Sequence, residues 1–492
     1  NLKMRIHDSC TEILRSGKKS NVDIFSLRAA ETIASDLERL TDICHDSVRL
    51  MQNLASYSAL KKQHTADLLD EVIDGISYIE QAIEEDDTQL ALKAGQVERK
   101  LDRAYHKLFD RQLKNLKKQK YPENTITALF VAQRIEEMGN VLLNIAESIM
   151  SAKLGQPMHL DRFRSLKSAL SDLGLIDAEV EQIAETRSGS GISGISSKDD
   201  DEGYVAIFKD GNKEKLKEER ESVESWHEIF PGLAPQILSY NKKGKNASLL
   251  IEHLPGLTFE QILLHEPDDC LDKTLKYLTK TIKAVWLETR RKKGISANHI
   301  QQLRKRLPSV FEVHPMFESE KMRICGTRIK SLHDLIETAE KMEKKLPPPF
   351  SVYIHGDFNL DNIIFDMDSE KIRFIDLHRS CYLDYVQDIA VFMVSNYRLQ
   401  VLNKPTRQRI TRVALSIYKF ASDFAAKHDD DSFEIRLALG LARSFITSTR
   451  FILDKSLAKK MFFRGVYLLE RVTELDEASM KDFKLPVREL FT

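Results

Sequence analysis

Apolar residues recur at every third or fourth position through most of the first 185 residues, which is the spacing of long amphipathic helices. Residues 33–43 and 131–149 each contain such a row. Stretches with Gly, Pro, Asp or Asn chemistry that can stop one helix and start the next occur near residues 16–17, 85–87, 121–124 and 154–157. A softer break lies near residues 57–63. The pattern predicts about six helices, running up and down, over residues 1–185.

The two long central helices of this region are similar to each other. Residues 37–42 (Leu-Glu-Arg-Leu-Thr-Asp) fall on residues 135–140 (Ile-Glu-Glu-Met-Gly-Asn) when the chain is compared with itself at an offset of 98. Two three-helix repeats, each unable to bury its apolar face alone, would pack into one bundle. Coincidence between two amphipathic helices is the alternative explanation.

The composition changes abruptly after the helices. Residues 186–203 are rich in Gly, Ser and Asp, which by itself is typical of a flexible linker. This segment is followed by a β-like run at residues 204–208 and a charged helix at residues 214–229. Two more apolar runs lie at residues 248–251 and 351–354, and helical spacing returns at residues 405–474. This order predicts a mixed α/β domain that ends in helices.

Charge and composition narrow the class of protein. The 492 residues contain 74 Lys+Arg and 75 Asp+Glu, a net charge of -1, which argues against a general nucleic-acid binder. The five cysteines show no CxxC spacing, which disfavours a zinc ribbon or a disulfide scaffold and favours a reducing cytoplasm. Only 19 Gly and 13 Pro are present, as expected of a largely helical protein.

The apolar runs are also too short to cross a bilayer, so we expect no membrane span. The segment Asn1-Leu2-Lys3-Met4-Arg5 lacks the apolar core of a signal peptide, which agrees with a cytoplasmic location. Because residue 1 is Asn rather than Met, we expect this chain to start inside a longer reading frame.

The most informative polar residues lie between strand-like runs in residues 352–376. Asp357, Asn362 and Asp376 follow or precede apolar segments, where they can converge on one site. Phosphoryl transfer from a nucleotide needs a carboxylate to deprotonate the acceptor hydroxyl and two oxygen ligands for Mg²⁺. Asp357 fits the first role, and Asn362 and Asp376 fit the second. Capping of a hairpin turn is the structural alternative for any one of them.

The sequence His355-Gly356-Asp357 through Asn362, with Ile375-Asp376 and Gln387-Asp388 downstream, resembles the aminoglycoside phosphotransferase and choline kinase type of protein-kinase-like fold. The resemblance covers about residues 188–474 and implies a small ATP-binding lobe ahead of a larger helical lobe. It implies that Asp357 is the catalytic base, that Asn362 and Asp376 bind Mg²⁺, and that Asp388 is structural. Residues 377–380, Leu-His-Arg-Ser, depart from the glycine-led turn of the family.

The same resemblance assigns nucleotide-binding roles to the preceding segments. It implies a Gly-rich phosphate loop that contains Gly189, Gly191 and Gly194. It also implies that Lys209 binds phosphate and that Glu219 is the ion-pair partner of this lysine. Glu252 would lie in the hinge that receives adenine. Glu218 is an alternative to Glu219, and a solvated helix face would explain either. We therefore expect kinase-like lobes over residues 186–255 and 256–492, with residues 186–203 serving as linker and phosphate loop.

The amino-terminal helices resemble the PhoU family of phosphate-uptake regulators. The resemblance is carried by residues 37–46 and by residues 135–147. The second of these segments ends in Asn-Ile-Ala-Glu. It implies a bundle of two three-helix repeats over residues 1–185 and a partner in the phosphate-uptake machinery, either a transporter or a sensor kinase.

Acidic stripes in this bundle raise the question of metal binding. Glu38, Asp42 and Asp46 are spaced four residues apart on one helix face, and Glu98 and Asp102 form a similar pair. A solvated or ion-paired helix face is the favoured explanation of both stripes. Asn140 and Asn144 stand where the repeat would place acidic ligands, which argues against a metal cluster.

We therefore predict an ATP- and Mg²⁺-dependent phosphotransferase that acts on a small-molecule hydroxyl and is coupled to a PhoU-like regulatory domain. The alternative is a nucleotide-binding regulator of phosphate uptake or signalling with little or no transfer activity. Protein-serine kinase activity is less favoured, because no Ala-Pro-Glu segment is evident. The acceptor's identity and dimerisation through the bundle both stay open.

Overall fold

The structure is a computed structural model of the whole chain. It describes residues 2–15, 24–54, 57, 60, 65–85, 87–115, 122–155, 158–172, 179–185, 191–196, 204–243, 246–318, 322–324, 327–401 and 403–492. The chain forms two compact units, one made of Asn1–Gly211 with Ser239–Leu250 and the other of Asn212–Leu238 with Ile251–Thr492. Each unit is described in turn.

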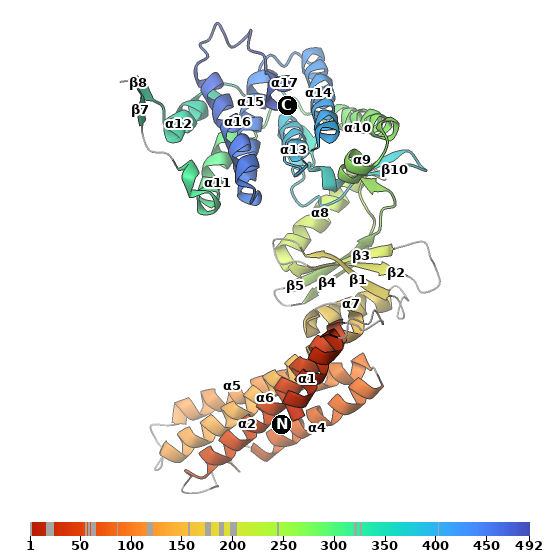
Figure 1. Cartoon of the computed structure of the whole chain (residues 1–492), viewed down its shortest axis with the longest axis vertical. Coiled ribbons are helices and arrows are strands. Elements are labelled where there is room, and N and C mark those ends of the chain that lie inside the picture. Colours follow the sequence, from red (N-terminus) through yellow and green to blue (C-terminus); the bar gives the residue numbers. More distant parts are fainter. Residues whose placement is uncertain are drawn as a thin grey trace. The chain divides into compact units, whose positions relative to one another are not determined.

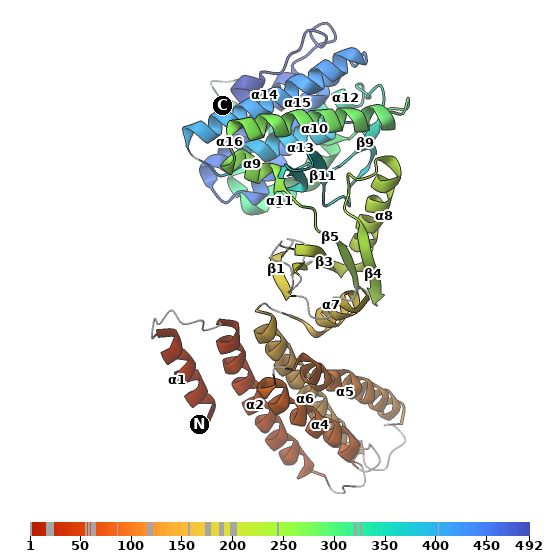
Figure 2. The ribbon, with the colours of Figure 1, turned by 90° about the vertical axis from the view of Figure 1, so that its right-hand side faces the viewer.

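The described residues at the start of the first unit form six helices. They are α1 (Leu2–Arg15), α2 (Ile24–Met51), α4 (Thr65–Glu84), α5 (Thr88–Asn115), α6 (Pro122–Leu154) and α7 (Leu160–Asp172). Helices α2, α4, α5 and α6 lie side by side as a bundle (Figure 2). The ends of these helices agree with the breaks expected from the sequence, and outside the break between α2 and α4 Gly, Pro or Asp residues interrupt the apolar spacing there.

Helix α6 is central to the bundle. Its residues Ile135, Met138, Val141 and Ile145 are almost completely buried, and they belong to one apolar core with residues of α2, α4 and α5. The apolar residues that predicted a helix thus also form its packing surface, which is the usual source of stability for such helices.

A five-stranded sheet completes the first unit. Its strands, β1 (Glu179–Glu185), β2 (Gly191–Ser196), β3 (Tyr204–Asn212), β4 (Ile237–Lys243) and β5 (Asn246–Glu252), lie in the order β1-β2-β3-β5-β4. The pairs β1/β2 and β2/β3 are antiparallel, with Ile192 opposite Lys209.

Strand β1 corrects an expectation from the sequence. Helical spacing was expected to continue to residue 185, but the last helix of the bundle ends at Asp172, and Glu179–Glu185 pairs along its length with β2. Strand β2 likewise lies inside the Gly/Ser-rich segment interpreted as a linker. In both cases hydrogen bonding between strands, which is not a local property, overrides the local pattern.

Helix α7 packs on this sheet (Figure 1). Phe163, Leu166 and Leu170 of α7 share one apolar cluster with Ile195 of β2 and Phe208 of β3. The bundle and the sheet therefore have a common core rather than a flexible connection.

The second unit begins with α8 (Lys213–Ile229), where a charged helix was predicted, and continues as a mainly helical domain. Its other helices are α9 (Phe259–His265), α10 (Asp268–Thr289), α11 (His299–Val313), α12 (Leu332–Glu343), α13 (Val386–Tyr397), α14 (Lys404–Lys427), α15 (Phe433–Ser448), α16 (Lys455–Thr473) and α17 (Val487–Leu490), with short 3-10 turns η2 (Pro315–Phe317), η3 (Leu360–Asn362) and η4 (Thr449–Phe451).

Three small antiparallel sheets accompany these helices. They pair β11 (Lys371–Phe374) with β10 (Ile363–Asp366) and β10 with β6 (Leu257–Thr258), β12 (Cys381–Leu383) with β9 (Val352–Ile354), and β7 (Met322–Ile324) with β8 (Thr327–Ile329).

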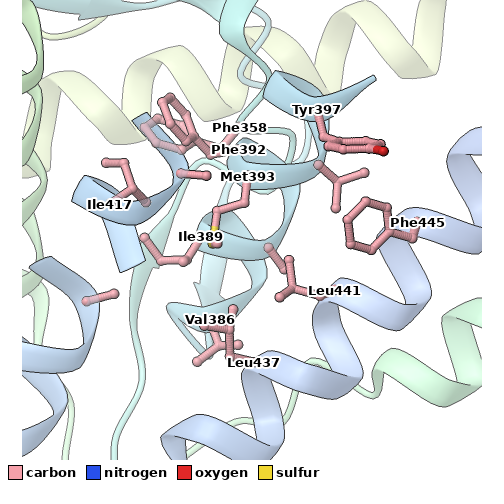
Figure 3. Close-up of a cluster of buried hydrophobic side chains, with 14 of the residues drawn as sticks. Phe358, Val386, Ile389, Phe392, Met393, Tyr397, Ile417, Leu437, Leu441 and Phe445 are labelled. Carbon is pink, nitrogen blue, oxygen red and sulfur yellow. The ribbon is translucent and has the colours of Figure 1, made fainter. Parts of the chain in front are cut away.

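The core of the second unit surrounds α13. Figure 3 shows Val386, Ile389 and Met393 of α13 between Ile417 of α14 and Leu441 of α15, all of them buried. Phe358, which follows β9, packs against Phe392 of the same helix. This core holds the loop after β9 in place. No helix among the described residues has the length and apolarity needed to span a membrane.

Candidate active site

Two antiparallel strand pairs, β9/β12 and β10/β11, position the loops that carry Asp357, Asn362 and Asp376. Asp357 follows strand β9 by three residues, and Asn362 ends the 3-10 turn that leads into β10. Asp376 follows β11 by two residues, and β12 then pairs with β9. The strand pairing thus brings the two polar loops together.

Asp357 is held by two neighbours. The Asn359 side chain donates through Nδ2 to Asp357 Oδ1 over 2.8 Å, and Arg379 Nη1 lies 3.0 Å from Asp357 Oδ2. The Asp357 side chain retains 20% of its exposure. It is a carboxylate at the surface of a cavity, with both oxygens oriented by the protein.

Asn362 is buried directly behind Asp357. Its side-chain Nδ2 donates to the backbone carbonyl of Asp357 over 2.8 Å, and its backbone carbonyl accepts the N–H of Ile375 over 3.1 Å. Because Nδ2 is used by Asp357, the amide oxygen is the side-chain atom of Asn362 that is left for a ligand. The Ile375 bond connects the turn to the segment that carries Asp376.

Asp376 has an unusual backbone conformation, with φ at +59°. Non-glycine residues rarely adopt this left-handed region, and aspartate is among the few that do. Its Oδ1 lies 2.8 Å from Nδ1 of His378, and this hydrogen bond raises the pKa of His378. A strained aspartate that surrounding contacts hold in place is a common feature of functional loops.

His355 and Asp388 hold the loop from behind. The Asp388 carboxylate accepts the backbone N–H groups of His355 and Gly356 over 2.7 and 2.9 Å, and burial raises the pKa of Asp388 to about 7. Nε2 of buried His355 contacts the carbonyl of Ile375 at 3.0 Å, and burial lowers the pKa of His355. These are the contacts of positioning residues.

Glycine is required at position 356. Its φ is +83°, and a Cβ there would come within 2.2 Å of the backbone oxygen of Arg379. The close approach brings the Arg379 segment next to Asp357, so any larger residue would separate the two.

Of the residues predicted to bind nucleotide, several lie in the first unit. Gly191 and Gly194 are on β2, and half-buried Lys209 is opposite Ile192 in the sheet. Gly189 lies outside the described residues. A Cβ at Gly194 would come within 2.5 Å of the Tyr204 ring, so this glycine is also needed for packing.

Glu219 and Glu252 lie in the second unit. Glu219 is buried on α8 and contributes to the raised pKa of His378. Helix α8 also contacts the loop after Asp376, because Trp226 Nε1 donates to Ser380 Oγ over 2.8 Å. The Glu252 carboxylate accepts the backbone N–H of Gln236 over 3.0 Å. The expected pairing of Glu219 with Lys209 and the binding of adenine at Glu252 stay predictions.

The acidic stripes of the bundle are partly ion-paired. Glu38 Oε2 lies 2.5 Å from Lys3 Nζ, and His106 lies 3.0 Å from Asp102. Within the described ranges, no three His, Cys, Asp or Glu side chains are grouped so as to hold a metal ion.

A cavity of about 190 Å³ adjoins Asp357, and no sequence pattern indicated that arginines would line it. Arg306 of α11, Arg379 and Arg443 of α15 line it together with Gln302 and Gln387. The i, i+4 spacing of Gln302 and Arg306 was visible in the sequence, but it did not indicate where the pair would point. Only the packing of α11, α13 and α15 brings these residues beside Asp357.

Comparisons with known proteins agree with this arrangement. Residues 205–402 match the phosphotransferase enzyme family, and residues 65–149 match the PhoU domain. Residues 37–46, which carry the resemblance in the first predicted repeat, lie outside the second match. No curated protein matches the chain.

Distantly similar solved structures include three kinases of small molecules. A Plasmodium vivax ethanolamine kinase is 16% identical with a TM-score of 0.36, covering 68% of this chain and 90% of its own. An aminoglycoside-3'-phosphotransferase of type VIII is 16% identical with a TM-score of 0.37, covering 57% and 99%. A choline kinase from Cryptosporidium parvum is 14% identical with a TM-score of 0.36, covering 64% and 94%.

The family matches include the strand that carries Lys209, all three residues of the predicted catalytic set and the helix α6 at the centre of the bundle. The chain therefore contains a PhoU domain within residues 65–149 and a domain of the phosphotransferase enzyme family within residues 205–402.

Proposed function

We propose that this protein transfers the γ-phosphoryl group of ATP to a hydroxyl of a small molecule in a Mg²⁺-dependent reaction. The observation that carries the proposal is the placement of Asp357, Asn362 and Asp376 on connected loops beside a cavity. The family match supports a phosphotransferase, and the presence of a cavity next to Asp357 favours a small acceptor over a protein.

Asp357 would act as the base. The acceptor oxygen attacks the γ-phosphorus, the bond from that phosphorus to the ADP oxygen breaks, and the hydroxyl proton passes to the Asp357 carboxylate. Asn359 holds one oxygen of Asp357, which orients the carboxylate. For the second oxygen to receive the proton, Arg379 must shift from its position 3.0 Å away.

Asn362 and Asp376 would hold Mg²⁺. Amide and carboxylate oxygens are ligands suited to this hard cation, and the Asn362 amide is oriented by its bond to the Asp357 backbone. When bound, the ion would neutralise negative charge that develops during transfer. Lys209 and the glycines of β2 stay the predicted ligands of the nucleotide phosphates, and Glu219 stays the predicted partner of the lysine.

The direct test replaces Asp357 with Asn. Phosphoryl transfer to the acceptor should fall at least about 100-fold, whereas the dissociation constant for ATP should stay nearly unchanged. Asp368→Asn, at an exposed turn between β10 and β11, is the matched control and should retain activity. Retained turnover in the Asp357 variant would remove the base role from this residue.

We further propose that the PhoU domain regulates the kinase-like domain through α7. Arg162 of α7 lies 2.9 Å from Asp210 through Nε, and its Nη2 donates to Ser193 Oγ over 2.9 Å. The Arg162 side chain is 9% exposed. Asp210 is the residue after Lys209 on β3, and Ser193 is on the Gly-rich strand β2, so a movement of α7 would act on both nucleotide-binding strands.

Substitution of Arg162 tests this coupling. Arg162→Gln should change the KM for ATP by about 5-fold or more, because the bond from the bundle to β3 is lost. Lys167→Gln, which removes a charge from the same helix, serves as the control. Equal KM values for ATP in the two variants would show that the Arg162 contact does not couple the bundle to nucleotide binding. By analogy with the domain's family, the partner on the bundle would belong to the phosphate-uptake system.

A nucleotide-binding regulator without transfer activity is the second candidate. The ion pair between Arg379 and Asp357 favours this candidate, because Arg379 engages the carboxylate of the proposed base when no acceptor is present. Binding of ATP with no turnover on any hydroxyl compound would support this candidate.

A further inference from the structure

We propose that the cavity beside Asp357 is the acceptor site and that it selects a hydroxyl compound carrying an anionic group, either a carboxylate or a phosphate. The inference rests on the proposed phosphotransferase function and adds the charge class of the acceptor. It is carried by the arginines of the cavity.

The cavity is cationic. Three of its lining side chains, Arg306, Arg379 and Arg443, are guanidinium groups, and Asp357 is its single carboxylate among the described residues. Because Arg379 is already paired with Asp357, the charges of Arg306 and Arg443 are left to a ligand.

Arg443 is the strongest indication. The residue is 4% exposed, its Nη2 donates to the neutral amide oxygen of Gln387 over 2.8 Å, and its Nε is buried without a hydrogen-bond partner. Burial lowers the pKa of Arg443 to about 9. A buried guanidinium without an anion is costly, so its retention beside a cavity points to a ligand that supplies the anion.

Arg306 reaches the same cavity from α11. It donates through Nη1 to Gln302 over 3.2 Å, and burial together with the positive charges of Arg450 and Arg379 lowers its pKa. Of the described residues, no carboxylate lies within 4.0 Å of the guanidinium nitrogens of Arg306 or Arg443.

Glu343, the other carboxylate that acts on Arg443, does not form an ion pair with it. Glu343 influences the pKa of Arg443, but its two oxygens accept the backbone N–H groups of His299 and Ile300, over 2.5 and 3.0 Å. Guanidinium groups bind carboxylate and phosphate through strong charge-assisted hydrogen bonds. The same groups would repel an ammonium-bearing acceptor, since the interaction of like charges is strong in a site of low dielectric.

Direct binding to the full-length protein tests the anion site without turnover. Inorganic phosphate and acetate are titrated calorimetrically, with the nucleotide site first saturated by Mg²⁺ and a non-hydrolysable ATP analogue. One of these anions should bind at a single site, and Arg306→Gln should weaken it about 10-fold or more. Arg306→Lys, which keeps the charge, should restore part of the affinity.

Arg304→Gln is the matched control for these variants. Arg304 is also on α11, but it is half exposed and pairs with Glu340 over 2.6 Å, away from the cavity. The variant should bind the anion as the unmodified protein does.

The outcomes separate the two proposals and the two anions. Preference for acetate or for phosphate identifies a carboxylate or a phosphate ester as the acceptor's anionic group. No anion binding, or equal binding by Arg306→Gln and the unmodified protein, would overturn the inference. So would anion binding that the ATP analogue abolishes, because the arginines would then face the transferred phosphoryl group. If the protein does not bind ATP, the proposed function fails. The anion titration repeated without nucleotide still measures anion binding in the cavity in that case.

Turnover provides the second arm. Glycerate, glycerol and aminopropanediol present the same diol with an anionic, a neutral and a cationic third group. We expect kcat/KM to fall in that order, and Arg306→Gln to raise KM for glycerate about 10-fold with little change in kcat. A preference for the cationic compound would overturn the inference.

Discussion

Arg379 Nη1 lies 3.0 Å from Oδ2 of Asp357, so a residue of the loop after Asp376 covers the predicted base. About half of the Arg379 side chain is exposed. An ion pair this accessible contributes at most about 1 kcal/mol to stability and can exchange with a ligand. The pair therefore bears more on the resting state of the site than on the fold.

Replacing Arg379 with Gln should release Asp357 in the absence of an acceptor. We expect the slow hydrolysis of ATP by water to rise about 3-fold or more, because 1 kcal/mol corresponds to roughly a 5-fold change in population. The free energy of unfolding should change by less than about 1 kcal/mol. A phosphate-release assay and urea unfolding measure the two effects. A fall in hydrolysis would instead show that Arg379 takes part in transfer.

Asp388→Asn should weaken the catalytic loop. The carboxylate accepts two backbone N–H groups, and an amide nitrogen in place of one oxygen would face a donor with another donor. We expect a loss of about 1–3 kcal/mol in the free energy of unfolding and a drop in kcat. Asp384→Asn is no suitable control, because Asp384 is ion-paired to buried Arg436. The control is Asp368→Asn, which replaces an exposed carboxylate. Unchanged activity in Asp388→Asn would contradict the positioning role.

Two glycines allow a matched test of the close approach at residue 356. Gly356 and Gly232 both have φ of +83°, but a Cβ at Gly232 would meet nothing within 4 Å. Gly232→Ala should cost about 1–2 kcal/mol, the conformational penalty alone. Gly356→Ala should cost more and should abolish transfer, because the Arg379 backbone has to move. Similar thermal midpoints and activities for the two variants would refute this account.

His299 should make the protein less stable at acidic pH. It is fully buried, neither ring nitrogen has a hydrogen-bond partner, and burial lowers its pKa well below 6.5. The folded protein therefore keeps His299 neutral, while the unfolded chain takes up a proton below about pH 6.5. This stability is present above pH 6.5 and is lost as the pH falls, by up to about 1.4 kcal/mol per pH unit.

Urea unfolding at pH 7.5 and 5.5 measures this effect. His299→Leu should reduce the difference between the two free energies of unfolding, because it removes the titrating group. His333→Leu, at an exposed position of α12, should leave the difference unchanged. The same difference in all three proteins would assign the pH dependence to other groups.

Local sequence patterns determined a large part of this protein. The helices of residues 1–172 were predictable because their apolar spacing and their Gly, Pro and Asp interruptions act within a few residues. Asp357, Asn362 and Asp376 were predictable as a group because each directly follows or precedes a short apolar run. Their assigned chemistry depends on residue type and order, both of which are written in the chain.

Tertiary structure alone decided the remaining features. Strand β1 looked helical in sequence and became a strand because β2 hydrogen-bonds along it. Arg306 and Arg443 are 137 positions apart, and nothing local to either one indicates that α11 and α15 place both beside Asp357. The contact of Arg162 with Asp210 likewise depends on α7 packing against the sheet. Such contacts arise from burial of apolar faces between distant segments, so the periodicity of a single segment does not determine them.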